Sequence, residues 1–290
     1  MAEAMTDLTG RTCLVTGATR GIGRATAEAL AKLGANVLIH GRDSASVGAV
    51  CRSTLRVSRG GQVTGAVADF ASLKSVRRMA EEVAAQHPRL DVLVNNAGAG
   101  ALKRRASTDG FEWLFAVNHL APFLLTKLLL PTLTNSAPAR IVTVASMAYR
   151  RAVLDFDDLQ WERRKYQSLG AYSVSKLANI LFTLELSRRL DGTRVTANCL
   201  HPGVVATNIF SSLGTLGKVF SVLARPLLMS PAAGAKTSVH LASAPELANV
   251  SGRFFERSRE VPLDRIAQDE AAARRLWETS EALVTRALKA

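Results

Sequence analysis

Short apolar segments alternate with longer segments of helical spacing along most of this chain, and this alternation restricts the fold more than any other feature. Strand candidates rich in β-branched residues lie at 12–16, 36–40, 62–67, 92–94, 141–145 and 194–200. Helix candidates lie at 23–33, 72–86, 111–130 and 172–190. Strands that alternate with helices form parallel sheets that are covered on both faces. The sequence therefore predicts an α/β fold, a doubly wound parallel sheet with helices on both faces.

A glycine-rich segment connects the first strand candidate to the first helix candidate: Thr16-Gly17-Ala18-Thr19-Arg20-Gly21-Ile22-Gly23. Glycines at such a junction permit a tight turn, let the backbone approach a pyrophosphate and let the helix pack closely on the strand. The N-terminus of the following helix also favours a phosphate group. We expect a Rossmann-type site for a dinucleotide cofactor, bound by Gly17, Thr19, Arg20, Gly21, Ile22 and Gly23.

Tyr172 and Lys176 are candidates for acid–base chemistry. They are four residues apart on a predicted helix, so their side chains share one face. A neighbouring ammonium lowers a tyrosine pKa from about 10 toward neutrality, where acid–base catalysis is most effective. The same spacing is also common in ordinary amphipathic helices.

Ser146 is a third candidate because it follows the strand candidate 141–145. Open α/β sheets bind ligands at the carboxyl ends of their strands. The alternative for Ser146 is a strand-end hydroxyl that hydrogen-bonds to the local backbone.

The glycine spacing G-x-x-x-G-x-G, the Tyr/Lys pair and Ser146 together resemble the short-chain dehydrogenase/reductase family, in its single-domain branch. Further motifs of this family follow in order: Asn95-Asn96-Ala97-Gly98, then Asn118, then Pro202-Gly203. The resemblance extends from residue 10 to about residue 262. Within the family, segments 117–126, 172–179 and 200–207 look most similar to the retinol-dehydrogenase-like group.

The resemblance implies a role for each candidate residue. Tyr172 would transfer a proton to or from the substrate oxygen, and Ser146 would bind that oxygen. Lys176 would lower the pKa of Tyr172 and bind the nicotinamide ribose, while Asn118 would hold a water in a proton relay. The further cofactor contacts that the family motifs imply are Asp69, Asn95, Ala97, Gly98, Pro202, Gly203, Val205 and Thr207.

The residues after the second strand candidate predict NADP(H) rather than NAD(H). An acidic residue there would bind the ribose hydroxyls of NAD, whereas an arginine accommodates the 2′-phosphate of NADP. Gly41 stands in the acidic position, and Arg42 follows it. Arg20 could add a second contact, since guanidinium groups bind phosphate through paired planar donors. Asp43 is the competing signal for NAD, and we interpret it as the N-cap of the next helix.

The composition restricts the kinds of partner and the cellular location that we expect for this chain. The chain has 290 residues, 48% of them hydrophobic, a net charge of +13 and three cysteines. We identify no membrane span and no secretory signal, and we expect one cytoplasmic domain over residues 1–290, with a flexible start at 1–8 and a helical tail at 267–290. The widely spaced cysteines predict neither disulfides nor a metal site. The basic residues lack an interleaved aromatic stripe, so they predict a solvated surface rather than a nucleic-acid partner.

Two segments are predicted to border the substrate. Segment 147–169 carries Phe156, Trp161 and Tyr166 and is expected to roof the site. Segment 209–229 matches the mobile substrate lid of the family, and its many aliphatic residues indicate a bulky apolar substrate. Ordinary core or partner-facing packing is the alternative for its individual residues.

The predicted function is an oxidoreductase that transfers a hydride between NADP(H) and a bulky apolar ketone, aldehyde or secondary alcohol, as a carbonyl reductase or alcohol dehydrogenase does. A protochlorophyllide-reductase-like enzyme and a non-enzymatic NADP(H)-sensing scaffold are the alternatives. Homodimers and homotetramers are common in the family, and the sequence does not distinguish between these two oligomeric states.

Overall fold

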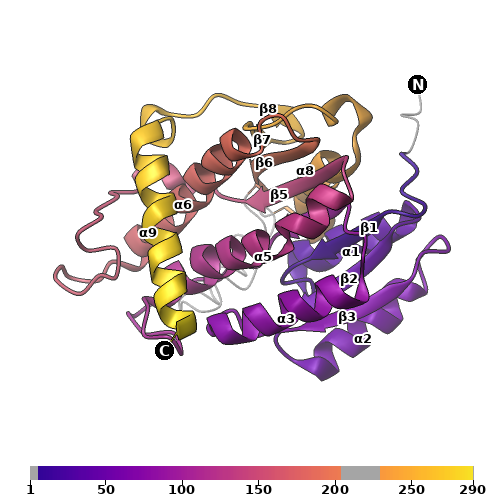
Figure 1. Ribbon diagram of the computed structural model, residues 1–290, viewed down its shortest axis with the longest axis horizontal. Helices are drawn as coiled ribbons and strands as arrows, with labels where there is room; N and C mark the ends of the chain where they lie inside the picture. The colour runs from indigo at the N-terminus through magenta and orange to yellow at the C-terminus, as the bar shows by residue number, and fades with distance from the viewer. Residues whose placement is uncertain (1–5, 204–228, 290) are drawn as a thin grey trace.

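A mostly parallel sheet forms the centre of the protein (Figure 1). The structure is a computed structural model that describes residues 6–203 and 229–289. Within these residues the sheet has eight strands in the order β3-β2-β1-β4-β5-β6-β7-β8. The strands are β1 Thr12–Val15, β2 Asn36–Gly41, β3 Val63–Val67, β4 Val92–Asn95, β5 Ala139–Val144, β6 Val195–His201, β7 Phe254–Glu256 and β8 Arg259–Glu260. Strand β8 runs antiparallel to β7, and the other neighbouring strands are parallel.

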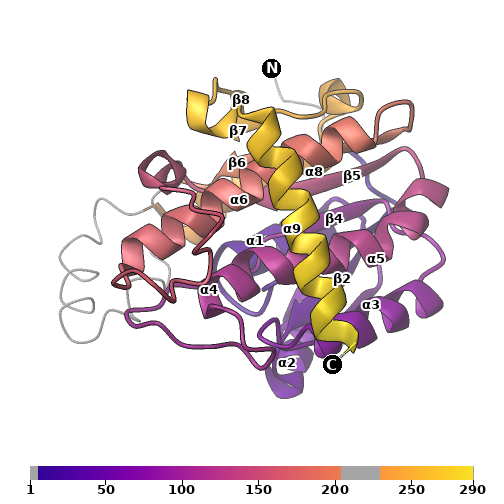
Figure 2. The same cartoon turned by 60° about the vertical axis from the view of Figure 1, so that its left-hand side comes forward.

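Helices cover both faces of this sheet, as expected from the alternation in the sequence (Figures 1 and 2). The longer helices are α1 Gly21–Lys32, α2 Ser44–Leu55, α3 Leu73–Gln86, α5 Ala121–Asn135, α6 Ser168–Arg189, α8 Pro231–Ser243 and α9 Glu270–Lys289. Helices α1, α2 and α8 share one hydrophobic cluster with the sheet, while α3, α5, α6 and α9 share the other. The predicted doubly wound Rossmann-type fold is confirmed.

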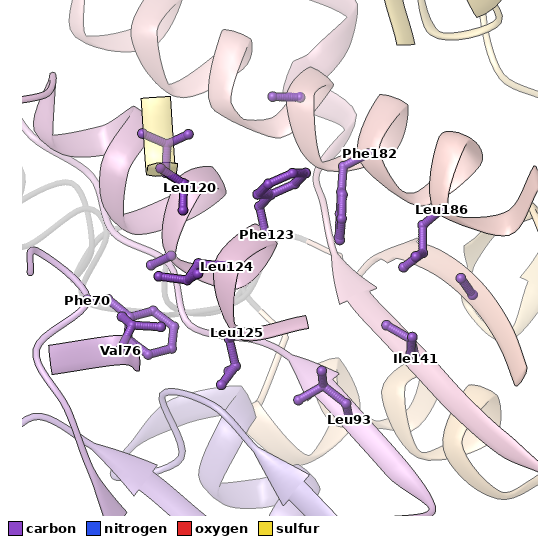
Figure 3. Close-up of a cluster of buried hydrophobic side chains, with 14 of the residues drawn as sticks. Phe70, Val76, Leu93, Leu120, Phe123, Leu124, Leu125, Ile141, Phe182 and Leu186 are labelled. Carbon is purple, nitrogen blue, oxygen red and sulfur yellow. The ribbon is translucent and has the colours of Figure 1, made fainter. Parts of the chain in front are cut away.

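Burial on both faces of the sheet explains why the central strands are mostly apolar. All four residues of β1 and all four of β4 are buried. On one face, Phe123 of α5 and Phe182 of α6 lie over Leu93 and Ile141 of the sheet (Figure 3). The two phenylalanine rings meet edge to face with centroids 5.6 Å apart. Such burial stabilises the fold by about 25 cal/mol per Å² of apolar surface.

The six predicted strands are present, with ends within two residues of the predicted ones. Strands β7 and β8 were missed because they have three and two residues, too few to show a pattern. The predicted helix at 111–130 consists of α4 Trp113–Phe115, the π-helical turn η1 Ala116–Leu120 and α5, which continues past Pro131.

The first and last described segments both pack on the rest of the protein. Leu8, expected in a flexible start, is buried, and its amide donates to the carbonyl oxygen of Leu33 at 2.8 Å. Residues 1–5 lie outside the described residues. The predicted helical tail is α9, which packs across α6 and reaches α3 (Figure 2). Its apolar face, including Leu276 and Trp277, is buried.

The expectation that no segment could span a membrane was wrong. Segment Trp113–Asn135 has 23 residues and a mean hydropathy of 1.5, so its length and composition suffice to cross a bilayer. Within this segment Lys127 and Pro131 interrupt the apolar run 123–133. In this fold 78% of the apolar window is buried inside the protein. The predicted absence of a membrane partner therefore has no basis in the sequence, and we do not retain it.

Candidate active site

The candidate site residues gather at the carboxyl ends of β1, β4 and β5. Strand order changes direction between β1 and β4, since β1 has β2 on one side and β4 on the other. Ligands of open α/β sheets bind at such a point. The glycine loop follows β1, the segment from Asn96 to Ala99 follows β4, and Ser146 follows β5. Helix α6 carries Tyr172 and Lys176.

Close packing explains two of the three loop glycines. Gly17 has φ of +63°, and a Cβ there would lie 2.8 Å from Ala97 Cα. A Cβ on Gly23 would lie 2.3 Å from Asn96 Nδ2 and 2.5 Å from the carbonyl oxygen of Gly17. Both positions therefore exclude a side chain, and the start of α1 is held against the segment after β4.

Thr16 and Asn96 hold these two segments together, and neither was among the predicted site residues. The Thr16 hydroxyl accepts from the amides of Asn96 (2.9 Å) and Ala97 (3.0 Å). The Asn96 side chain donates to the carbonyl oxygen of Thr16 at 2.7 Å. The position of Asn96 in the Asn95-Asn96-Ala97-Gly98 motif is the sequence signal that could have identified it.

Asn95, in contrast, was predicted to contact the cofactor, and its side chain does not face the glycine loop. It is buried, and its Nδ2 donates to Thr126 Oγ1 of α5 at 2.9 Å. Strand geometry explains the difference, because successive side chains point to opposite faces of a sheet. Asn95 therefore fixes α5 on β4, and Asn96 fixes the glycine loop.

The end of β2 carries the residues on which the predicted cofactor preference depends. A Cβ on Gly41 would lie 2.4 Å from Thr19 Cγ2 and 2.9 Å from Val47 Cγ2, so a side chain at this position would require these two side chains to move. The side chains of Arg20 and Arg42 are exposed. Asp43 accepts from the amide of Ser46 at 2.8 Å, which confirms it as the N-cap of α2, and this hydrogen bonding lowers the pKa of Asp43.

Asp69, the residue predicted beside the adenine, follows β3 and is exposed. Its Oδ1 accepts from the amide of Ala71 at 2.9 Å. The carboxylate therefore fixes the turn that leads from β3 into α3.

Lys176 is buried beside Tyr172 at the end of β5. Its Nζ donates to the carbonyl oxygen of Val144 at 3.0 Å and lies 5.7 Å from the centroid of the Tyr172 ring. Burial lowers the pKa of Lys176 to about 8. Burial also raises the pKa of Tyr172, and hydrogen bonding by Ser146 opposes this. Burial of the phenol therefore acts against the lowering of the Tyr172 pKa that we predict from Lys176.

Asn118 lies in the π-helical turn η1 and is fully buried. Its Nδ2 donates to the carbonyl oxygen of Ala99 and to Ser175 Oγ, both at 3.0 Å, and its Oδ1 accepts from the amide of Ala99 at 2.8 Å. A π-turn inserts one residue into a helix and often occurs at functional sites. Asn118 thus joins the segment after β4 to the helix that carries Tyr172.

Gly98 separates Asn118 from Lys176. A Cβ on Gly98 would lie 3.3 Å from Lys176 Nζ and 3.7 Å from Asn118 Oδ1. A side chain there would occupy the space between these polar atoms, and glycine leaves that space open. This geometry is compatible with the predicted relay through a water molecule.

The Ser146 hydroxyl hydrogen-bonds to the local backbone, which is the alternative to a substrate-binding role. Its Oγ accepts from the amide of Ala148 at 3.2 Å and caps the 3₁₀ turn η2, Met147–Arg151. The same hydroxyl acts on the pKa of Tyr172, which hydrogen bonding by Ser146 lowers against the larger effect of burial. This influence on the Tyr172 phenol is compatible with the predicted pairing of Ser146 and Tyr172 at one site.

Segment 147–169 packs beside the start of α6, next to Tyr172. Trp161 is buried in a cluster with Leu114 and Ala171, and Tyr172 packs against this cluster. The predicted lid at 209–229 lies outside the described residues except for Met229, as do Val205 and Thr207. Pro202 and Gly203 follow β6, and a Cβ on Gly203 would lie 2.4 Å from Met229 Sδ. Among the described residues, no cluster of His, Cys, Asp and Glu could hold a metal ion.

Glu112 is a buried carboxylate that anchors this segment, and it was not among the predicted site residues. Its oxygens accept from the amides of Leu114 (3.0 Å) and Phe115 (2.7 Å) at the start of α4. Tyr166 donates its hydroxyl to Glu112 Oε1 at 3.1 Å, and the Glu112 amide donates to Gln160 Oε1 at 2.7 Å. Two residues of segment 147–169 are thereby attached to one position before α4.

Comparison with known proteins adds independent evidence about this site. The family model for short chain dehydrogenases matches residues 11–215. Retinol dehydrogenase 14 of Homo sapiens is 45% identical over 291 residues, which cover 95% of this chain and 86% of that protein. Retinol dehydrogenase 13 of Homo sapiens is 44% identical over 95% of this chain and 85% of that protein. The resemblance to the retinol-dehydrogenase-like group is thereby confirmed.

Solved structures agree with the family model. An uncharacterized protein from Mycobacterium Paratuberculosis superposes with a TM-score of 0.80 at 36% identity, covering 97% of this chain and 96% of that one. An NAD(P) dependent gluconate 5-dehydrogenase from Beutenbergia cavernae, with NADP bound at low occupancy, has a TM-score of 0.70 at 31% identity and covers 87% of this chain and 96% of that one.

Proposed function

Since this chain belongs to the short-chain dehydrogenase family and is an oxidoreductase, we propose that it transfers a hydride between NADP(H) and a bulky apolar ketone, aldehyde or alcohol. The observation that carries this proposal is the position of Tyr172. Tyr172 lies on α6 with the buried Lys176 ammonium 5.7 Å from its ring centroid, and hydrogen bonding by Ser146, which follows β5, acts on the pKa of its phenol.

Tyr172 is the group that would move the proton. Burial raises its pKa, so it carries its proton at neutral pH and can donate it to a carbonyl oxygen. Ser146 would hold the same oxygen and stabilise the negative charge that develops on it. The buried Lys176 and the space beside Gly98 provide a way for the proton to be replaced from the Asn118 side. The nicotinamide supplies or accepts the hydride when the cofactor is bound.

The preference for NADP(H) rests on the end of β2. Gly41 stands where an acidic residue would bind the NAD ribose, and the Thr19 side chain occupies the space beside it. Arg20 and Arg42 both have exposed guanidinium groups at this end of the sheet. Guanidinium groups bind phosphate through paired hydrogen bonds, which suits the 2′-phosphate of NADP.

The apolar substrate is supported by two features. Trp161 and its cluster border Tyr172 with apolar surface. Relatives with 40–45% identity carry the name retinol dehydrogenase, and retinol is a long apolar alcohol. Apolar surface that becomes buried contributes about 25 cal/mol per Å², so a large hydrophobic substrate should bind more tightly than a small polar one.

A panel of ketones, aldehydes and alcohols, followed at the nicotinamide absorbance with NADPH or NADP⁺, tests the proposal. The panel includes retinol and retinaldehyde, short aliphatic carbonyls, sugars and hydroxy acids. We expect kcat/KM to be highest for large hydrophobic substrates and lowest for sugars and hydroxy acids. A small polar compound as the best substrate would contradict the apolar site. Tight cofactor binding without turnover of any compound would favour the non-enzymatic scaffold.

A further inference from the structure

His40, near the end of β2, is a buried histidine whose two ring nitrogens both have backbone partners. The amide of Gly17 lies 3.1 Å from His40 Nδ1, and the carbonyl oxygen of Ala68 lies 3.1 Å from Nε2. Gly17 belongs to the glycine loop after β1, and Ala68 follows β3. One imidazole therefore bridges the loops that follow two different strands of the sheet.

These contacts fix the protonation state of the ring. An amide can only donate, so Nδ1 must present a lone pair to Gly17. A carbonyl can only accept, so Nε2 must carry the hydrogen toward Ala68. The imidazole is thus neutral and in one tautomer. Phe70 stacks on the ring with centroids 4.3 Å apart, and the carbonyl oxygen of His40 accepts from the amide of Ala18 at 2.8 Å.

The three joined segments carry the residues expected around the adenosine half of the cofactor. Arg20 lies in the loop with Gly17, Arg42 follows Gly41 at the end of β2, and Asp69 is next to Ala68. These side chains are exposed, so their positions depend on the backbone beneath them. Loops that are not fixed before binding must be ordered at binding, and this ordering weakens affinity.

We propose that His40 is a positioning residue that sets the affinity for the adenosine 2′-phosphate half of the cofactor, by holding the glycine loop and the segment after β3 in register with the end of β2. The inference rests on the proposed function in taking a dinucleotide as the ligand. His40 touches neither the substrate nor the reacting atoms.

A dependence on pH follows from the geometry. A proton on Nδ1 would face the Gly17 amide with a second donor, so the contact would be lost. Burial lowers the pKa of His40 to about 4, and the Ala68 carbonyl and the charge of Asp69 oppose that shift. The remaining ring contacts are the Gly17 amide and the apolar face of Phe70. The arrangement is complete at neutral pH and is lost as the pH falls through about 4.

Three variants separate the two contacts. His40→Asn keeps an acceptor near the position of Nδ1, His40→Gln keeps a donor near the position of Nε2, and His40→Leu keeps neither. Fluorescence titration gives the Kd for NADPH, for 2′,5′-ADP and for nicotinamide mononucleotide, and kcat is measured at saturating NADPH. His87→Leu is the control, since His87 is a partly exposed histidine at the end of α3.

We expect His40→Leu to raise the Kd for NADPH and for 2′,5′-ADP about tenfold, the loss expected for about one hydrogen bond. His40→Asn should recover most of the affinity, because it restores the acceptor for Gly17. The Kd for nicotinamide mononucleotide, kcat at saturation and all values for His87→Leu should stay unchanged. Between pH 6 and 4, the Kd ratio of wild type to His40→Asn should rise, and the same comparison in an Asp69→Asn background removes the titration of that carboxylate.

Two outcomes would overturn the inference while leaving the proposed function intact. One is an unchanged Kd for 2′,5′-ADP in His40→Leu. The other is an equal loss for both cofactor halves together with a fall in kcat, which would mean a general structural role. If His40→Leu does not fold, a wild-type Kd for 2′,5′-ADP in both His40→Asn and His40→Gln would overturn the inference in the same way. A wild-type protein that binds neither NADPH nor NADH would refute the proposed function and this inference with it.

Discussion

The ammonium of Lys176 on α6 donates a hydrogen bond to the carbonyl oxygen of Val144, the last residue of β5, at a distance of 3.0 Å. This bond directs a buried charge to the edge of the sheet where Ser146 follows two residues later. Removal from water lowers the pKa of Lys176 to about 8, so the group remains mostly charged at neutral pH but can exchange its proton readily. Burial of the Lys176 ammonium therefore lowers the stability of the fold.

Tyr172→Phe should lose nearly all turnover while cofactor binding is retained. The ring keeps its packing against the Trp161 cluster, and only the hydroxyl is lost. General acid–base catalysis contributes about 10²–10⁴-fold, so kcat should fall by that factor while the Kd for NADPH changes little. Stopped-flow reduction of the best substrate and a cofactor titration measure the two quantities. Turnover within a few-fold of wild type would exclude Tyr172 as the proton donor.

Lys176→Met should lose activity without losing stability at pH 7. Methionine fills similar space without a buried charge, and Asn179 Nδ2 remains 3.5 Å from the carbonyl oxygen of Val144. An unfolded lysine loses its proton near pH 10.5, whereas folded Lys176 does so near pH 8. The unfolded state therefore binds more protons between these values, and the wild type should gain stability relative to the variant as the pH rises from 8 to 10.5.

Urea unfolding of both proteins across this pH range measures the stability difference. Lys74→Met, at an exposed position of α3, is the control and should show no such pH dependence. A variant that is far less stable than wild type at pH 7 would mean that the Val144 contact outweighs the cost of the buried charge.

Arg42→Ala should reduce the preference for NADPH over NADH. We expect the wild type to bind NADPH at least about tenfold more tightly, which corresponds to about 1.4 kcal/mol. Arg20→Ala should have a similar effect, and Arg56→Ala, at an exposed position after α2, should have none. Dissociation constants for both cofactors test this expectation. Equal affinities in the wild type, or an unchanged preference in Arg42→Ala, would remove Arg42 from the phosphate site.

Glu112→Ala should destabilise the protein more than Tyr166→Phe does. The first change leaves the amides of Leu114 and Phe115 without their carboxylate acceptors, at a cost of about 1–3 kcal/mol. The second removes one hydrogen bond, typically worth about 1 kcal/mol. Denaturant unfolding of the two single variants and the double variant gives the coupling between them.

The same variants test whether segment 147–169 borders the substrate. Tyr166→Phe should raise KM for the best substrate more than it raises the Kd for NADPH. If the variant changes neither KM nor kcat, the segment contributes to stability alone.

Local spacing determined several features of this protein from the sequence alone. The alternation of strand and helix candidates predicted the sheet, and a spacing of four placed Tyr172 and Lys176 on one face of α6. Asp43 was identified as the cap of α2, because a capping side chain bonds to an amide only three residues away. Such features depend on contacts within a few residues, which can be recognised in the order of residue types.

Only the tertiary structure decided the features that depend on burial and on contacts between distant elements. The direction of the Tyr172 pKa follows from how much protein covers the phenol, which spacing does not reveal. Asn95 contacts α5 and Asn96 contacts the glycine loop, and this difference depends on the face of the sheet that each side chain meets. His40 meets Gly17 and Ala68, and Glu112 meets Gln160 and Tyr166, across 23 to 54 residues of sequence, so the residues next to them along the chain did not indicate these contacts. Packing brings these groups out of water and next to one another, and desolvation then sets their charge states and the geometry of the site.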